Sequence, residues 1–206
     1  FCEPRPDHQN LPLNERAKIK ARQGVELISS GELRVVDDDG NEVPHDGETL
    51  GEITVRGNVV MKGYYNDPEA TAAAIKDGWF HSGDAAVVHD DGFVEIRDRF
   101  KDVIISGGEN ISSVEVEGCL LHHPSVQEVA VVGMPHEKWG ETPHAFVVLK
   151  EGAAASEDEI KLHVRDNLAH FKTPSWVSFV EDLPKTATGK VQKYVLRGGA
   201  SGISRQ

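Results

Sequence analysis

Cysteine is scarce in this chain of 206 residues, which contains only Cys2 and Cys119. Two thiols cannot build the disulfide framework of small secreted domains, and they are too few for a cysteine metal cage. Long apolar runs are missing as well, because no stretch approaches the roughly 18 residues of a membrane-spanning helix. We therefore expect a packed protein without an integral membrane segment, located in the cytoplasm or in an organelle matrix.

Positive charge is the second shortage. The chain has 22 lysines and arginines against 34 aspartates and glutamates, which gives a net charge of −12. A nucleic-acid-binding surface needs an excess of basic residues on one face, so we expect no nucleic-acid partner. The chain also begins with Phe1 rather than methionine. We expect it to be a piece of a longer protein whose N-terminus, with any targeting signal, is missing.

A metal site is not expected either. The run His136-Glu137-Lys138-Trp139-Gly140 begins like a zinc-protease motif, but Gly140 stands where the second histidine is required. Two histidines must lie four residues apart to share one face of a helix. The remaining histidines show no ligand spacing, and we predict no metal ligands.

Apolar and polar residues alternate in the first part of the chain, which predicts a β-rich fold. We expect strands at Gly24–Ser29, Glu32–Asp37 and Gly51–Arg56, and a hairpin between Ala85 and Arg97. Two helices are predicted, one over Asn14–Arg22 and one that starts at the capping Asp67 and runs to about Lys76. This part should form a small barrel-like sheet.

Beyond Arg99 helices and strands alternate. Ser112 and Ser156 each open a capping box and predict helices to about Leu121 and Ala169. Further strands are expected at 102–106, 126–132, 145–149 and 176–180, with a short helix near Tyr194. The predicted fold class is α+β. We place a β-rich domain at residues 1–98, a hinge at 99–102 and a compact α+β domain at 103–206.

The segment Leu183–Lys193 carries the clearest chemical signal, with three lysines, two threonines and Gly189 directly before Lys190. Glycine allows a sharp bend, and a lysine on such a bend can bring its charge to a phosphate or carboxylate oxygen. It is not a Walker motif, because Val191 replaces the hydroxyl residue and Pro184 replaces the first glycine. Taken alone, the segment fits a solvated basic loop better than a site.

Three other motifs precede this segment: His81-Ser82-Gly83-Asp84, Arg97–Asp102 and Ser106–Asn110. In this order and spacing, the four motifs resemble the C-terminal part of acyl-CoA synthetases of the acyl-activating type. Those enzymes belong to the adenylate-forming (AMP-dependent synthetase and ligase) superfamily. The resemblance implies that residues 1–98 are a remnant of its large N-terminal AMP-binding domain. Residues 103–206 would then be its C-terminal domain.

The resemblance implies three nucleotide contacts. Asp84 matches the aspartate that binds the ribose of ATP and of the acyl-adenylate, and Arg99 matches an arginine that contacts the same sugar. Lys190 matches the catalytic lysine that bridges the carboxylate, the ribose and the α-phosphate during adenylation. Without the resemblance, Asp84 would be interpreted as a turn or cap, and Arg99 as part of a surface ion pair with Asp98 or Asp102.

The resemblance also implies a hinge at Lys101 and a binding region for CoA. A glycine matching Gly108, next to Gly107, leaves room for the pantetheine arm beside the backbone in CoA-forming relatives. Trp139 and Phe171 match aromatic residues that stack on the adenine of CoA in some ligases. For Trp139 the alternative of a half-buried packing residue remains open.

The implied activity is that of an ATP-dependent acid–thiol ligase. A fatty or aromatic carboxylic acid attacks the α-phosphate of ATP, and the CoA thiol then displaces AMP from the acyl-adenylate to give an acyl-CoA. The implied cofactors are ATP or AMP with Mg²⁺, and CoA. The partners are these small molecules, and the oligomeric state is not predicted.

Two family motifs do not occur in residues 1–206: the Ser/Thr/Gly-rich phosphate loop and the aromatic-Gly-x-Thr-Glu adenine motif. We therefore expect the chain to be the C-terminal fragment of a ligase and to be inactive alone. Two alternatives stay open. One is a non-catalytic regulatory or binding remnant. The other is an adenylating enzyme with a non-CoA acceptor, against which Trp139, Gly107 and Gly108 argue.

Overall fold

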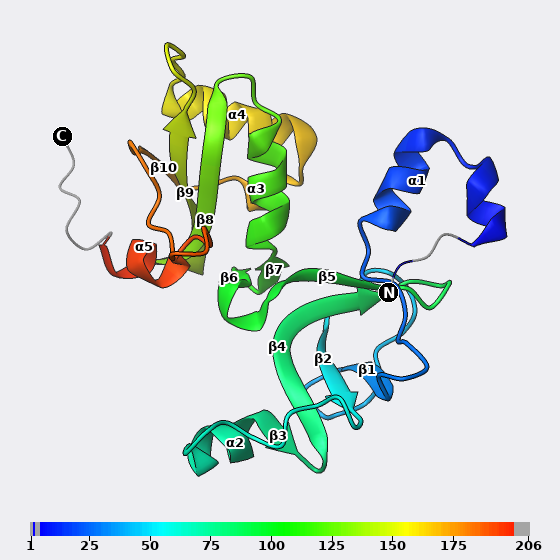
Figure 1. Cartoon of the computed structure of the whole chain (residues 1–206). Coiled ribbons are helices and arrows are strands. Elements are labelled where there is room, and N and C mark those ends of the chain that lie inside the picture. The colour runs from blue at the N-terminus through cyan, green and yellow to red at the C-terminus, as the bar shows by residue number, and fades with distance from the viewer. Residues whose placement is uncertain (1, 3–4, 200–206) are drawn as a thin grey trace. The chain divides into compact units, whose positions relative to one another are not determined.

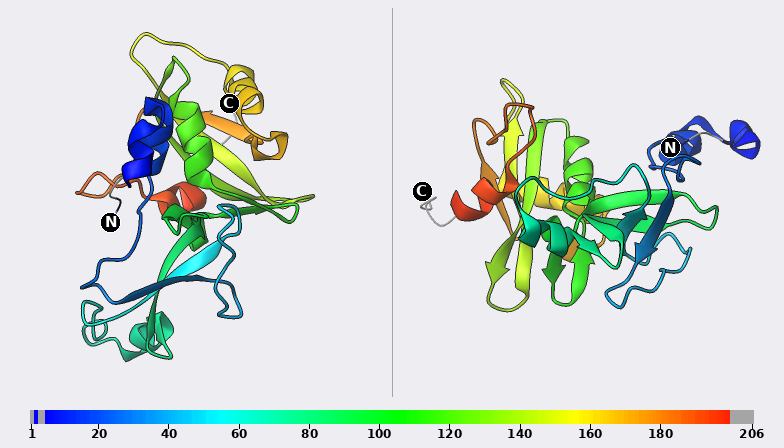
Figure 2. Two further views of the ribbon diagram at one scale, coloured as in Figure 1. Left: turned by 90° about the vertical axis from the view of Figure 1, so that its right-hand side faces the viewer. Right: turned by 60° about the horizontal axis from the view of Figure 1, so that its bottom comes forward.

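The computed structural model describes residue 2 and residues 5–199, and it divides the chain into two compact units, Phe1–Lys101 and Asp102–Gln206. Figures 1 and 2 show the elements of each unit. Mixed helices and curled sheets confirm the predicted α+β class. Among the described residues, no helix combines the length and apolarity needed to span a membrane.

The first unit is built on one curled sheet, and in Figure 1 the long strand β4 bends strongly. The strand order is β1-β2-β4-β3, and β5 pairs with β4. Its elements are η1 (Pro6–Asn10), α1 (Leu13–Lys20), β1 (Glu32–Val36), β2 (Gly51–Arg56), α2 (Pro68–Ala74), β3 (Ile75–Lys76), β4 (Trp79–Val88), β5 (Val94–Arg99) and η2 (Phe100–Asp102), the last of which runs into the second unit.

Alternating apolar residues of β1, β2, β4 and β5 build the core of this sheet, as the period of two requires. The core cluster contains Val35, Ile53, Ala86, Val88 and Val94 from these strands, and Val43 from the loop between β1 and β2. The predicted strand at Gly24–Ser29 is wrong. Only Gly24 forms a bridge, to Val94, and the side chain of Ser30 bonds to both main-chain groups of Leu27 to close a turn. The apolar side chains Leu27 and Ile28 are exposed there, so their presence was not a strand signal.

The second unit contains β6 (Ile104–Ser106), β7 (Glu109–Ile111), α3 (Ser113–Leu121), β8 (Val126–His136), β9 (Gly140–Leu149), α4 (Glu157–Asn167), η3 (His170–Lys172), β10 (Trp176–Phe179) and α5 (Lys193–Gly199). The strand order is β10-β9-β6-β7, and β8 pairs with β9. Strands β8 and β9 extend well beyond the predicted ranges, because they form one long antiparallel hairpin.

Successive residues of β8 enter two different cores, one on each face of this sheet. Val129 and Val131 pack with Val116 and Leu120 of α3 and with Ile160 and Val164 of α4. On the other face Ala130 and Val132 pack with Phe146, Val148, Leu183 and Leu196. The last two residues flank the lysine segment, so the polar loop between them has an apolar anchor on each side.

Candidate functional site

Asp84 lies in an irregular stretch of strand β4. Glu52 of β2 lies opposite Ala85, and Thr54 lies opposite His81. Between these pairs, one residue of β2 faces three residues of β4, namely Ser82, Gly83 and Asp84. Such bulges redirect side chains and are common beside active sites.

The Asp84 carboxylate is accessible to solvent and close to Arg99. The two residues lie opposite each other in the β4–β5 ladder, and the Arg99 Nε atom is 3.6 Å from Asp84 Oδ1. The Asp84 side chain retains 29% exposure and that of Arg99 59%. Asp102, which the sequence left open as a partner of Arg99, instead pairs with Arg197. The pair therefore presents a carboxylate and a guanidinium together, a combination that can hydrogen-bond vicinal hydroxyls.

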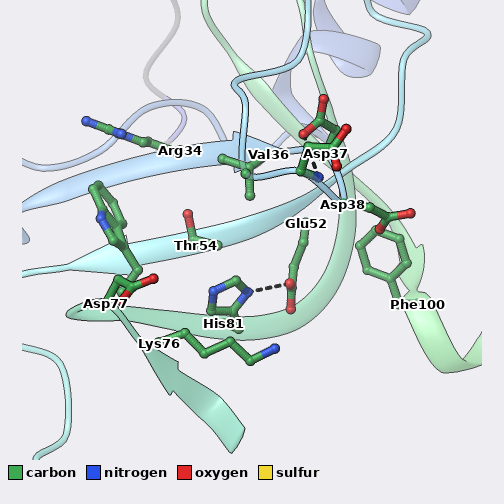
Figure 3. A pocket seen from close by; sticks show the side chains of 13 residues that line it. Arg34, Val36, Asp37, Asp38, Glu52, Thr54, Lys76, Asp77, His81 and Phe100 are labelled. Carbon is green, nitrogen blue, oxygen red and sulfur yellow. Dashed lines mark hydrogen bonds and ion pairs between the residues drawn. The ribbon is translucent and has the colours of Figure 1, made fainter.

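A groove of about 640 Å³ lies on the same sheet (Figure 3). Among the residues that line it are Arg34, Trp79, Glu52, His81 and Phe100. The Arg34 guanidinium stacks 4.4 Å from the centre of the Trp79 ring. Figure 3 shows His81 pointing at Glu52 across the floor, where His81 Nδ1 lies 2.6 Å from Glu52 Oε2.

Lys190 follows a tight turn in the second unit. The Gly189 N–H donates to the Thr186 carbonyl at 2.9 Å, and Gly189 has φ of +83°. The Thr186 N–H in turn donates to the Lys190 carbonyl, and the Lys190 N–H donates to the Thr186 hydroxyl. These bonds fix the backbone of Lys190 and leave its side chain exposed.

The other cations of this segment, and Arg197 shortly after it, are held by carboxylates. Lys185 pairs with Glu128 and Asp182, and its hydrogen bond to Glu128 is the main reason that its pKa rises above the ordinary value. Lys193 pairs with Glu117, and Arg197 with Asp102. Within residue 2 and residues 5–199, the Lys190 ammonium has no hydrogen-bond or ion-pair partner. Lys190 is therefore the cation of this cluster that is available to a ligand.

Gly107 and Gly108 form the two-residue turn between β6 and β7, with φ of +61° and +92°. A hairpin turn with two positive φ angles is the type that favours glycine at both positions. The Gly107 N–H donates to the Trp139 carbonyl at 2.9 Å. A Cβ atom on Gly107 would lie 2.9 Å from Trp139 Cε3, whereas one on Gly108 would meet nothing within 4 Å. Trp139 thus packs on Gly107.

Trp139 and Phe171 line one cavity of about 470 Å³ together with Gly107. We call this space the aromatic cavity. Trp139 and Phe171 remain 45% and 46% exposed, so Trp139 both packs on the turn and offers ring surface to the cavity. Gly108 is adjacent in sequence but does not line it.

Polar residues that the sequence did not single out also line the aromatic cavity, among them Lys161, Arg165 and Thr173. Lys161 is tied to Glu157, whereas Arg165 has no carboxylate partner within the described residues and is exposed. The Thr173 hydroxyl is buried and lacks a hydrogen-bond partner in the same part of the chain. Arg165 lies on the polar face of α4, and nothing in its local sequence distinguishes it from any solvated arginine.

No metal centre is found in the part of the chain that the structure describes. No group of three or more histidine, cysteine, aspartate or glutamate residues could hold a metal ion there. Cys119 lies in α3 against the core, and burial raises the pKa of its thiol, which keeps it protonated.

The expected site residues other than Lys101 and Gly108 thus fall into three groups. Asp84 and Arg99 form a pair in the first unit. Gly107, Trp139 and Phe171 meet at the aromatic cavity in the second unit, and Lys190 lies on its own turn in the same unit. Lys101 is the last residue of the first unit.

Comparison with known proteins matches residues 115–190 to the AMP-binding enzyme C-terminal domain. Over 200 residues the chain is 53% identical to 4-hydroxybutyrate–CoA ligase 2 of Metallosphaera sedula. That match covers 97% of this chain and 36% of the relative. The chain therefore spans little more than a third of the length of this curated relative.

Solved structures agree with this match. o-Succinylbenzoate CoA synthetase from Bacillus subtilis, in complex with its acyl-adenylate intermediate, superposes with a TM-score of 0.80 at 35% identity. The superposition covers 95% of this chain and 38% of that chain. The amide bond synthetase McbA from Marinactinospora thermotolerans superposes with a TM-score of 0.79, also at 35% identity, over 90% of this chain and 38% of that chain.

Proposed function

The chain belongs to the adenylate-forming superfamily of AMP-binding enzymes, and on this premise we propose that it forms the C-terminal part of an ATP-dependent acyl-CoA synthetase. Its relatives include named CoA ligases. In the proposed reaction a carboxylate oxygen attacks the α-phosphorus of ATP, and the bond to pyrophosphate breaks. The CoA thiol then loses its proton and attacks the acyl carbon, and AMP leaves with the electrons of the broken C–O bond.

The Lys190 ammonium, which has no partner within the described part of the chain, is the observation that carries this proposal. Negative charge moves onto pyrophosphate during the first step, and a cation fixed beside the reacting centre stabilises that charge more in the transition state than in the ground state. A lysine already paired with a carboxylate would first have to break that ion pair, which costs free energy. Lys185 and Lys193 are paired in that way, whereas Lys190 has no carboxylate partner among the residues that the structure describes.

Asp84 and Arg99 are the proposed ribose ligands. An ionised carboxylate can accept hydrogen bonds from both sugar hydroxyls, and such charge-assisted bonds are about twice as strong as neutral ones. Arg99 lies 3.6 Å from Asp84, and its guanidinium adds a donor for the same sugar.

We further propose that residues 1–98 and 103–206 act as separate domains joined by a hinge at residues 99–102, with Lys101 as its pivot. Hinges are often a few residues at the end of an element, and Lys101 lies in the short 3-10 helix Phe100–Asp102. Between the two half-reactions, rotation at this hinge would withdraw the lysine loop (Leu183–Lys193) from the reacting phosphate and present the aromatic cavity instead. Such a movement is a form of gating.

The aromatic cavity is the proposed binding region for CoA. Trp139 and Phe171 offer ring surface for an adenine, and the Arg165 guanidinium, which lacks a carboxylate partner among the described residues, suits a phosphate. Gly107 leaves the backbone at its position beside the cavity free of a side chain.

A second candidate function is adenylation with an acceptor other than CoA. One structural neighbour is an amide bond synthetase, so this fold also occurs in an enzyme named for amide formation. The aromatic cavity favours CoA. Supplying the full-length protein with CoA or with amines after adenylate formation would separate the two acceptors.

The proposal is tested by measuring the two half-reactions in the full-length protein. Lys190→Ala should slow acid-dependent ATP–pyrophosphate exchange on the order of 10²–10³-fold, as the loss of one charge-stabilising group commonly does. Trp139→Ala should leave that exchange unchanged but raise the KM for CoA. Lys185→Ala, in the same loop, is the matched control because its charge is already paired. Normal exchange by the Lys190 variant would contradict the proposal.

A further inference from the structure

The bulge that carries Asp84 is held in place from the neighbouring strand by Glu52. Glu52 Oε1 accepts the Gly83 N–H at 2.9 Å, and Glu52 Oε2 lies 2.6 Å from His81 Nδ1. Extra residues in a bulge lose their normal ladder partners. One carboxylate therefore binds two donors of the segment that directly precedes Asp84, with charge-assisted bonds.

Ser82 supports the same segment. Its hydroxyl donates to the Ile53 carbonyl at 2.9 Å and accepts the Asp84 N–H at 3.1 Å. Gly83 has φ of +74°, in the region where residues other than glycine are strained. The main chain on both sides of Gly83 is thus fixed by side-chain bonds to β2, and its conformation decides where the Asp84 carboxylate points.

Packing does not explain an acidic residue at position 52. The Glu52 side chain is 26% exposed and lines the groove of Figure 3 rather than the core. Another glutamate on the same sheet, Glu32, pairs with Arg56 and bonds to no part of the bulge. Glu52 differs from Glu32 because both of its oxygens are directed at the segment His81–Gly83.

We propose that Glu52 is a positioning residue for the nucleotide site: it holds the Asp84 carboxylate in the orientation that binds the ribose. His81 in turn fixes the Glu52 carboxylate. The inference rests on the proposed function, because it takes Asp84 as the ribose ligand. It adds a residue that does not itself touch the nucleotide.

The structural part is tested on the chain itself by hydrogen exchange. Glu52→Ala removes the acceptor of the Gly83 N–H, so the Gly83 amide should exchange at least about tenfold faster, equivalent to about 1.4 kcal/mol. Glu52→Gln keeps an oxygen acceptor and should retain most of the protection. Glu32→Ala, the matched control, should leave Gly83 unchanged. Unaltered exchange in Glu52→Ala would overturn the inference whatever the protein catalyses.

The functional part is tested on the full-length protein by the kinetics of adenylation. Glu52→Ala should raise the KM for ATP about tenfold, equivalent to about 1.4 kcal/mol, with a smaller change in kcat. Glu52→Gln should largely restore the KM, and Glu32→Ala should not alter it. A general loss of stability would instead lower the active fraction without changing the KM.

Asp84→Ala separates the two failures. If Asp84→Ala leaves the KM for ATP unchanged, the proposed function of this site is wrong. If Asp84→Ala raises the KM and Glu52→Ala does not, only the role of Glu52 is wrong. Melting temperatures of all variants show whether each one folds.

Discussion

Single residues explain why the turn at positions 107 and 108 is formed by two glycines. Both have positive φ, but only Gly107 lies against another side chain, since a Cβ there would approach Trp139 Cε3 to 2.9 Å. Both positions therefore require a positive φ, but only position 107 also lacks room for a Cβ atom.

This difference predicts unequal stability losses. Gly108→Ala should cost about 1–2 kcal/mol, the penalty for an L-residue in the left-handed region. Gly107→Ala should cost more, because the Trp139 ring must also move. Urea unfolding of both variants measures the difference. Equal losses, or an unchanged Trp139 environment in Gly107→Ala, would argue against the packing described here.

The residues of the candidate site were predictable only in part. The four motifs carry their signal in local sequence, and so Asp84, Arg99 and Lys190 could be named. Glu52 and Arg165 could not, because their significance depends on partners or on a cavity formed by distant segments. Glu52 meets Gly83 across 31 positions of sequence, and nothing near Glu52 indicates that contact.

At the scale of elements, β9 and β10 meet at a half-buried histidine. His144 of β9 stacks on Phe146 with ring centres 4.4 Å apart, and its Nε2 atom lies 2.8 Å from the Ser178 hydroxyl of β10. Burial lowers the pKa of His144 below its ordinary 6.5, opposed by Glu157 and assisted by Lys161. The folded state therefore favours the neutral ring.

A pH-dependent stability follows from this shift. The unfolded chain binds the His144 proton more readily than the folded chain, so the contribution is complete above about pH 6.5 and decreases as the pH falls through the lower folded-state pKa. Urea unfolding between pH 7.5 and 5 should show a smaller advantage of the wild type over His144→Gln at the acidic end. The exposed His45, changed to glutamine, is the control. A constant difference between wild type and His144→Gln would refute the expectation.

Helix starts were predictable because their signals are local. Ser112 accepts the Glu115 N–H, and Ser156 forms the complete capping box with Glu159. Strand β7 was missed because two of its three residues, Glu109 and Asn110, are polar. It exists because the glycine turn folds this segment back onto β6. Pairing across a turn, rather than the composition of the strand, decides such short elements.

At the scale of the whole molecule, the sequence contains only part of the machinery that the proposed reaction requires. The phosphate loop and the adenine motif of the family do not occur in residues 1–206, and the chain spans 36% of the length of its Metallosphaera relative. The Asp84–Arg99 pair and Lys190 address the ribose and the reacting phosphate. They leave the adenine and the acid without dedicated residues.

The chain by itself should therefore release no measurable pyrophosphate from ATP with any of a panel of fatty and aromatic acids. Positioning of both reactants contributes a large share of such a rate, and most of that positioning would be lost. A coupled pyrophosphate assay on the purified chain measures this. Robust turnover would show that residues 1–206 already contain a complete site.

The two apolar residues that anchor the lysine loop limit how far the Lys190 ammonium can move. Leu183 and Leu196 are buried in the same core beneath β8 and β9, one on each side of Lys190. Detaching the loop would open that core to water. The Lys190 ammonium can therefore move farther than the length of its own side chain only when the whole unit Asp102–Gln206 moves with it.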